Sequence, residues 1–290
     1  MVTSMIKTIL VPMTGNAADM TAAGAALDVA RLFGAHLDFL HVRMDPGEVA
    51  AALASDVAGG MVSVSLIESL EAEAKQREDR AQKSFQDFCA RERLPVDVAP
   101  PDPNGVSALW HREVGSETAW IGEYGRTSDL LVVGRQANDQ GATRDILEAA
   151  LLDTGRPLFI PGTAPLSPQT IAIAWKSTRE AARAVTAASP FLAKAKRIVV
   201  LTVAEDDRMD RESGARLFAT LQRHNAATEA RHIPLGPRGA AETLLAAAAE
   251  AGAGLLVMGG YSHSRVRELI FGGVTAHVLR GAALPVLMAH

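Results

Sequence analysis

Cysteine is nearly absent from this sequence: the chain of 290 residues contains only Cys89. A single thiol forms neither an internal disulfide nor a CxxC metal site. Such low cysteine usage is typical of a reducing compartment, so we expect a cytoplasmic protein in which Cys89 is a packing residue of a helix.

Long hydrophobic runs are also missing. No stretch of about 18 apolar residues occurs, so the sequence predicts no membrane span. The closest segment, LLAAAAEAGAGLLVMGG, is interrupted by Glu250, Gly252 and Gly254. The amino terminus has only a short apolar run before Thr14, without the longer apolar stretch and cleavage site of a signal peptide.

Aromatic residues and an excess of basic charge are lacking as well. Aromatics make up 4% of the residues, and the net charge is −4 with acidic and basic residues mixed along the chain. Surfaces that bind nucleic acid combine basic stripes with aromatics that stack on bases. The composition therefore argues against a nucleic-acid partner, and it predicts cores built from Ala, Val, Leu and Ile.

The common catalytic and metal-binding motifs are absent too. There is no GxxxxGKS/T loop, no GxGxxG that opens a helix after the first strand, and no HExxH. His36 and His41 are five residues apart on a strand pattern, so they face opposite sides, which argues against a shared metal. Ser177 and Ser264 lie in no GxSxG elbow. The sequence thus indicates no side-chain catalytic apparatus.

An internal repeat is present. The length suggests two domains of about 145 residues each, and both halves show the same order of predicted elements. In each half a short buried strand precedes small polar residues, an Ala-rich helix and a second strand. The strands are Ile6–Pro12, His36–Val42, Thr170–Trp175 and Arg197–Val203, and the helices are Ala17–Phe33 and Thr178–Ala193.

The ends of the two halves match more closely. Ser128–Gly134 resembles Ala253–Gly259, and each is followed by a polar loop, a helix and a closing strand with a proline near its start. The closing strands are Arg156–Ile160 and Leu284–Met288. Pro161–Pro168 between the halves has the composition of a linker. We therefore predict a first domain at residues 1–162 and a second at 168–290.

The strand pattern predicts the fold class. The strands are continuous apolar runs, which is typical of strands buried on both faces by helices. Right-handed crossovers then give an α/β fold with a parallel, doubly wound sheet in each half. The first half also has a long charged helix, about Leu66 to Arg93, which we interpret as an ordinary covering helix closed by Pro95. Trp110 is expected in the core of a third strand.

A ligand site is expected at the carboxyl ends of the second sheet. In open parallel sheets, ligands bind beyond these ends, where the strand order reverses. The loops concerned follow Trp175, Val203 and Gly259. The last loop is rich in glycine, carries Arg265, and precedes a helix near Gly273 whose N-terminal N–H groups attract anions. These features predict binding of a phosphate group.

Over essentially its whole length, the chain resembles two copies of a universal stress protein (UspA-like) domain. The stretch GGYSHSRVRELIFGGVTAHVLRGAALPVLMAH reads like the C-terminal part of that family. Nucleotide-binding members carry Gly, two residues, Gly, nine residues and then Gly-Ser or Gly-Thr, ahead of a helix and a Pro-led last strand. The resemblance implies two tandem adenine nucleotide alpha hydrolase-like, Rossmann-like domains, with ATP or AMP as the ligand. We assign no metal to the site.

The resemblance also implies binding positions, with departures from the family pattern. Gly259 and Gly272 match the first and third glycines, whereas Ser262 replaces the second and Gly273 replaces the hydroxyl residue. Lys176 stands where the family offers an aspartate, and we interpret it as a direct cationic contact to phosphate. The implied nucleotide-binding residues are Trp175, Lys176, Ser177, Thr178, Val203, Gly259, Ser262, His263, Ser264, Arg265, Gly272, Gly273 and Val274.

Three members of this set have further interpretations. Val203 matches the small apolar position that contacts the adenine ring in the family. Trp175 either stacks on a ligand ring or seals the gap between the halves, and sealing is favoured. For His263, an exposed loop position is favoured over a phosphate or base contact.

The first half departs further from the pattern. Thr14-Gly15-Asn16 occupies the position of the acid, and no Gly-Ser or Gly-Thr precedes the final helix. Asp145 is expected near the N-terminus of that helix, where a negative charge stabilises the helix but repels phosphate. This half is therefore predicted to be structural.

The preferred function is that of a non-catalytic, stress-response binding protein. Nucleotide is expected to order the loop from Gly260 to Phe271 and so to change the affinity for a protein partner. The resemblance implies that the halves pack about a pseudo-twofold axis through their last strands and that two chains associate as a homodimer. The apolar final strand, Leu284–Ala289, is expected to be covered by another sheet.

Two alternatives stay open. The first is an ATP hydrolase or nucleotidyl-transfer enzyme of the same architecture, which needs an acid to hold a metal near the phosphates. Glu205, Asp206 and Asp207 are the candidate acids. The second is a structural or partner-binding module without a small ligand.

Overall fold

In the computed structural model the chain forms two compact units, Ile6–Thr154 and Gly155–His290, and each is described here by itself. The structure describes residues 6–47, 49, 64–98, 102, 105–135, 141–204, 207–237, 239–260 and 273–290.

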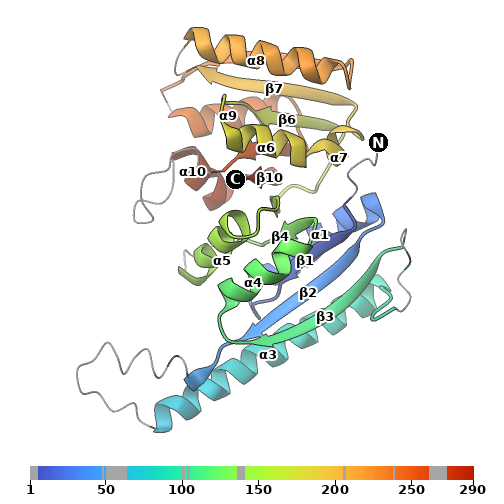
Figure 1. The fold of residues 1–290 in the computed structure, drawn as a ribbon, viewed down its shortest axis with the longest axis vertical. Helices are drawn as coiled ribbons and strands as arrows, with labels where there is room; N and C mark the ends of the chain where they lie inside the picture. Colours follow the sequence, from blue (N-terminus) through green and yellow to red (C-terminus); the bar gives the residue numbers. More distant parts are fainter. Residues whose placement is uncertain are drawn as a thin grey trace, which may run out of the picture. The chain divides into compact units, whose positions relative to one another are not determined.

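The first unit alternates strands and helices around a parallel sheet. Its elements are β1 (Thr8–Pro12), α1 (Ala18–Phe33), β2 (His36–Arg43), α3 (Val64–Glu92), β3 (Ser107–Val114), α4 (Glu117–Thr127), β4 (Leu130–Val132) and α5 (Gly141–Leu152). The strand order is β3-β2-β1-β4, and each neighbouring pair is parallel. Helices α4 and α5 cover one face of the sheet, whereas α1 and α3 cover the other (Figure 1). This is the doubly wound arrangement that the apolar strands predicted.

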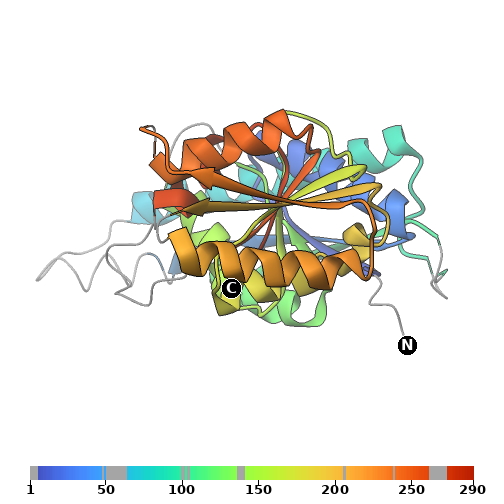
Figure 2. The ribbon, with the colours of Figure 1, turned by 90° about the horizontal axis from the view of Figure 1, so that it is seen from above.

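The second unit repeats this plan. Its elements are β5 (Leu158–Ile160), β6 (Thr170–Ala174), α6 (Arg179–Ala187), α7 (Ser189–Leu192), β7 (Arg197–Ala204), α8 (Asp207–Gln222), β8 (Thr228–Pro234), α9 (Gly239–Glu250), β9 (Leu255–Gly259), α10 (Gly273–Gly281) and β10 (Val286–Ala289). The strand order is β5-β10-β9-β6-β7-β8. All pairs are parallel except β5 with β10. Figure 2 shows α8 below and α9 above this sheet.

The final strand β10 lies inside its sheet. It pairs in parallel with β9 and antiparallel with β5, where Leu287 lies opposite Phe159. The apolar final strand is therefore covered on both edges. Strand β5, which the sequence assigned to the end of the first domain, pairs with β10 and falls in the compact unit Gly155–His290. The domain limits 1–162 and 168–290 and the pseudo-twofold axis stay predictions.

Continuous apolar runs form the sheet cores, as expected. Ile9, Leu10 and Val11 of β1 are fully buried, and so are Leu255 to Val257 of β9. Because helices cover both faces of these central strands, they need no polar alternation.

Some elements differ from the prediction. The helix expected over Thr178–Ala193 is two helices, α6 and α7, with Pro190 in the first turn of α7. Proline has no N–H to continue the hydrogen bonds of α6, so it favours the start of a new helix. Asp145 is the fifth residue of α5 and lies beyond its first turn, so its charge acts more weakly on the helix N-terminus than expected.

Cys89 is buried in α3, and burial raises the pKa of its thiol to about 11, which suits a packing residue. Trp110 packs on Phe85, with ring centroids 5.1 Å apart, but it is only half-buried and so lies at the edge of the expected core. Within the described ranges, no helix is both long and apolar enough to cross a membrane.

Candidate functional site

The expected site of the second unit lies where its strand order reverses, between β6 and β9. Strands β7, β6 and β9 are parallel neighbours, so their carboxyl ends meet at one edge of the sheet. These ends carry the loop that starts at Trp175, the residue Val203, and Gly259. The structure thus brings together three of the segments that the sequence selected.

The loop after β6 is fixed at both ends. The Trp175 N–H donates to the Leu201 carbonyl over 2.8 Å, which continues the pairing of β6 with β7. At the other end, Thr178 caps α6, because its hydroxyl oxygen accepts from the Ala181 N–H over 3.2 Å. Lys176 and Ser177 lie between these anchors and are exposed. The loop therefore presents a cation and a hydroxyl at the edge of the sheet.

A buried acid follows this loop, and the sequence reasoning missed it. Glu180 is 5% exposed and is the second residue of α6. Burial alone would raise the pKa of its carboxyl. Hydrogen bonds from its own N–H and from the Thr178 hydroxyl, with the charges of Arg179 and His290, outweigh burial and hold the pKa below its ordinary value. The carboxylate is thus used by the N-terminus of α6. An acid two residues after a capping Thr was the available signal.

Gly259 has a packing role that is visible in the structure. A Cβ at this position would lie 2.6 Å from the Ala181 N and 2.8 Å from the Glu180 carbonyl carbon. Only glycine lets the end of β9 approach the first turn of α6 this closely. Gly259 is therefore required for the close packing of β9 on α6, whether or not a ligand is bound.

The remaining members of the implied set divide into two groups. Val203 is half-buried and pairs with Ile233, and Val274 is half-buried in the first turn of α10, which begins at Gly273. Ser262, His263, Ser264, Arg265 and Gly272 lie outside the described residues.

The first unit has a small pocket at the equivalent edge, between the ends of β1 and β4. Its lining residues are Pro12, Thr14, Ala18, Asp19, Val133, Gly134 and Ile146. Gly134 repeats the role of Gly259, since a Cβ there would lie 2.4 Å from the Ala18 carbonyl oxygen. A glycine is therefore needed both where the chain leaves β4 near α1 and where β9 ends near α6.

The loop of the first unit is occupied by its own acid. The Asp19 carboxylate accepts from the Thr14 hydroxyl over 2.9 Å, the Gly15 N–H over 2.7 Å and the Asn16 N–H over 3.2 Å. Asp19 is 5% exposed, and burial raises the pKa of its carboxyl despite these bonds. The sequence placed Thr14-Gly15-Asn16 at the position of the acid. The structure shows that a carboxylate reaches this loop from α1.

Further charges surround this edge of the first unit. Arg77 of α3 donates through Nε and Nη2 to the Thr14 carbonyl, each over 3.2 Å. Burial raises the pKa of Glu117 to about 7, although the charge of Arg77 opposes the shift. Burial also lowers the pKa of Arg135 to about 10, and Arg135 stands where the second unit has Gly260. Arg77, Glu117 and Arg135 thus add three ionisable groups around this edge of the first unit.

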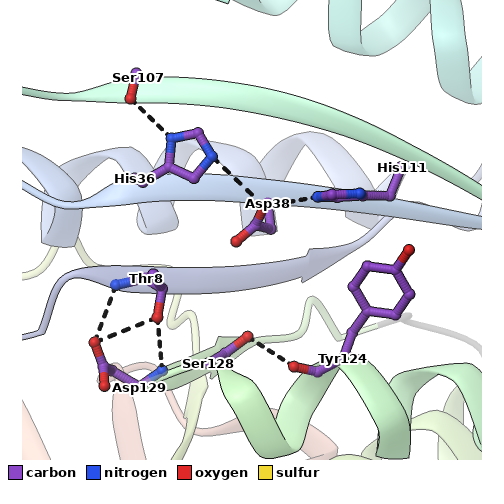
Figure 3. A network of polar contacts seen from close by, with 8 residues as sticks. All are labelled: Thr8, His36, Asp38, Ser107, His111, Tyr124, Ser128 and Asp129. Atoms are coloured by element: carbon purple, nitrogen blue, oxygen red, sulfur yellow. Dashed lines mark hydrogen bonds and ion pairs between the residues drawn. The ribbon is translucent and has the colours of Figure 1, made fainter. Parts of the chain in front are cut away.

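A separate polar cluster joins β2, β3 and α4 (Figure 3). Asp38 lies between two histidines: the His111 Nε2 is 2.7 Å from Asp38 Oδ1, and the His36 Nε2 is 3.5 Å from the same oxygen. The other nitrogen of His36 is 2.8 Å from the Ser107 hydroxyl, and the His111 ring meets Tyr124 edge-on at 5.0 Å.

This cluster connects β2 with β3, because the Asp38 carboxylate on β2 pairs with His111 on β3. Burial alone would raise the pKa of Asp38, but the hydrogen bonds and charges of His111 and His36 lower it to about 2. In the part of the chain that the structure describes, no group of three His, Cys, Asp or Glu side chains is arranged to hold a metal. His41 contacts the Met13 carbonyl and stacks on Trp110, which confirms that it faces the other side of β2 from His36.

Comparison with known proteins agrees with this architecture. The model of the universal stress protein family matches residues 5–141 and 168–290. A universal stress protein from Archaeoglobus fulgidus has a similar structure, with a TM-score of 0.65, 13% identity and 97% of each chain covered. A protein of unknown function from Pseudomonas aeruginosa matches with a TM-score of 0.56 and 15% identity, over 97% of this chain and 92% of that one. No curated protein sequence matches.

Proposed function

The chain belongs to the universal stress protein family in both of its halves, and from this premise we propose that it is a stress-response protein that binds one adenine nucleotide, ATP or AMP, in its second unit. The first unit supports this binding as a scaffold without a nucleotide of its own.

One observation carries the proposal: the loops after β1 and β6 differ in the hydrogen bonds that the nearby acid makes to them. In the first unit, Asp19 engages the hydroxyl and N–H donors of Thr14, Gly15 and Asn16, which are the groups that would meet an anion. In the second unit, Glu180 accepts from its own N–H and from the Thr178 hydroxyl, and the side chains of Lys176 and Ser177 are exposed at the edge. A phosphate is therefore favoured at the second edge.

The charge of Lys176 is the part of the proposal that is most directly testable. Hydrogen bonds from a cation to phosphate contribute about 1.5 to 3 kcal/mol, so Lys176→Ala is expected to weaken ATP binding by about 10-fold or more. Equilibrium dialysis with labelled ATP measures this loss. Lys196→Ala is the matched control, because Lys196 is exposed and precedes β7 at the opposite end of the strand.

Three outcomes separate the candidate functions. Retention of ATP by the wild type and by Lys196→Ala, with loss in Lys176→Ala, supports the proposal. Equal retention by all three proteins removes Lys176 from the site. No retention by the wild type favours a partner-binding module without a small ligand. For the enzyme alternative, Glu205 and Asp206 lie outside the described residues, and the structure describes no side chain at Asp207, so this alternative stays a prediction.

A further inference from the structure

Trp175 differs from its counterpart in the first repeat. The Met13 N–H donates to the Leu40 carbonyl over 2.7 Å, just as the Trp175 N–H donates to the Leu201 carbonyl, so the two residues hold equivalent places. Met13 is 1% exposed, whereas Trp175 is only half-buried. The second repeat therefore has a large, partly accessible aromatic ring where the first has a buried aliphatic side chain.

Helix α8 fixes the orientation of this ring. The indole Nε1–H of Trp175 donates to the Ser213 hydroxyl over 3.3 Å, and Ser213 is 3% exposed. Next to Ser213, Gly214 lets α8 lie close to β7, because a Cβ there would lie 2.7 Å from the Thr202 hydroxyl. The ring is thus held through its backbone and its indole nitrogen, so little side-chain entropy remains to be lost when a ligand binds.

The surroundings of the ring suit a ligand with two different parts. Val203 places an apolar side chain at the end of β7, the strand next to β6, and Lys176 places a cation beside Trp175 in the loop. Binding sites of this kind combine apolar or aromatic walls with a few polar groups that orient the ligand. A planar ring with an anionic tail matches both parts, whereas a bare phosphate matches only one.

We propose that Trp175 stacks on the adenine ring and thereby makes the second unit select a nucleotide over a simple polyphosphate. This inference rests on the proposed function and names its selectivity residue. Of the two roles expected for Trp175, it adopts stacking, because the indole N–H is satisfied by Ser213 within the same unit. Stacking of a base on an aromatic side chain corresponds to about a 5- to 150-fold difference in affinity.

The test compares ATP with inorganic triphosphate in the full chain, by isothermal titration calorimetry. Trp175→Met introduces the residue that the equivalent position of the first repeat already holds. We expect it to weaken ATP binding about 5- to 150-fold and to leave triphosphate binding within about 3-fold. Trp175→Phe keeps a ring and is expected to restore most of the ATP affinity. Ser213→Ala removes the anchor alone and is expected to cost less than Trp175→Met.

A second readout follows the ring itself. In a Trp110→Phe/Trp120→Phe background, Trp175 is the only tryptophan left, and ATP should quench its emission while triphosphate should not. Equal loss of ATP and triphosphate binding in Trp175→Met, or unchanged ATP binding, overturns the stacking role and leaves the proposed function standing. Absence of ATP binding by the wild type overturns the proposed function itself.

Discussion

At the scale of single residues, Gly134 and Gly259 hold equivalent positions in the two repeats and make the same close contact with a helix. Gly134 follows β4 and packs against the start of α1, and Gly259 ends β9 against the first turn of α6; in both, an added Cβ would lie less than 3 Å from the helix backbone. Side-chain repacking cannot relieve this contact, because the atoms that a Cβ would meet belong to the backbone.

We therefore expect Gly134→Ala and Gly259→Ala each to lower the free energy of unfolding by about 1 to 3 kcal/mol. Gly24→Ala in α1 is the matched control, since nothing lies within 4 Å of a Cβ there. This control should be neutral or stabilising by up to about 1 kcal/mol, because alanine favours helix over glycine. Urea denaturation measures all three. Equal values for the three variants would contradict the close approach.

The pKa of Asp38 gives a prediction with a defined pH window. The folded-state pKa of about 2 lies below the ordinary value of 3.8, so the charged form stabilises the folded state above the ordinary value and loses this effect as the pH falls through about 2. We expect Asp38→Asn to cost about 2 kcal/mol at about pH 5 and progressively less toward about pH 3.

The measurement is urea denaturation of the variant and the wild type across this pH range. Asp79→Asn is the control, because the Asp79 pair with Lys75 is exposed on α3 and should be worth less than about 0.5 kcal/mol at any pH. A cost of Asp38→Asn that does not change with pH would show that the histidines do not hold the charged form.

Sequence reasoning at this scale succeeded for some residues and failed for others. Gly259 and Lys176 were placed at the sheet edge because their positions follow directly from where the strands end. Asp19, Glu180 and Asp38 were missed as partners, since their contacts come from residues brought close by the fold or from the exact start of a helix. The opposite facing of His36 and His41 was predicted, because strand alternation is a local property.

At the scale of elements, the start of α6 depends on one hydroxyl. The Thr178 oxygen accepts from the Ala181 N–H, and the hydroxyl also bonds to Glu180. We expect Thr178→Ala to lower the free energy of unfolding by about 1 kcal/mol and Thr178→Ser to restore most of it. Thermal or urea denaturation followed by circular dichroism is suited to this comparison. A Thr178→Ser variant as unstable as Thr178→Ala would exclude the cap as the cause.

Strongly apolar elements were the ones that the sequence predicted well. The central strands were recognised because burial on both faces leaves continuous apolar runs. Strand β8, TEARHIP, was not recognised, since it pairs on one side only and carries charged residues such as Glu229 and Arg231. The end of α6 was also missed, although Pro190 was a local signal for it.

At the scale of the whole molecule, the pairing of the two closing strands, β5 and β10, followed from the family resemblance and not from any local pattern. Strand β5 follows the first half in the chain, but it pairs with β10, and its Phe159 is fully buried with Phe191 of α7 at a ring distance of 6.5 Å. Pairing between distant segments depends on tertiary contacts that no local pattern encodes. The repeat itself was readable, because both halves order their strands and helices alike.

Tryptophan reporters make this assignment testable, since Trp110 and Trp120 lie in the first unit and Trp175 in the second. Phe159→Ala should cost about 3 to 5 kcal/mol in the free energy of unfolding. In variants with one tryptophan each, it should lower the unfolding midpoint followed by Trp175 fluorescence more than the midpoint followed by Trp110 fluorescence. Phe39→Ala, at a buried position of the first unit, should do the reverse. A Phe159→Ala effect confined to Trp110 would place β5 with the first unit.

The central claim is that one of the two related edges binds a nucleotide, whereas the loop donors of the other are engaged by Asp19. Native mass spectrometry of the full chain, titrated with ATP, counts the bound nucleotides directly. We expect saturation at one nucleotide per chain. Binding of two nucleotides per chain would show that Asp19 does not keep a ligand out of the loop of the first unit. Absence of bound nucleotide at any ATP concentration would contradict the site proposed in the second unit.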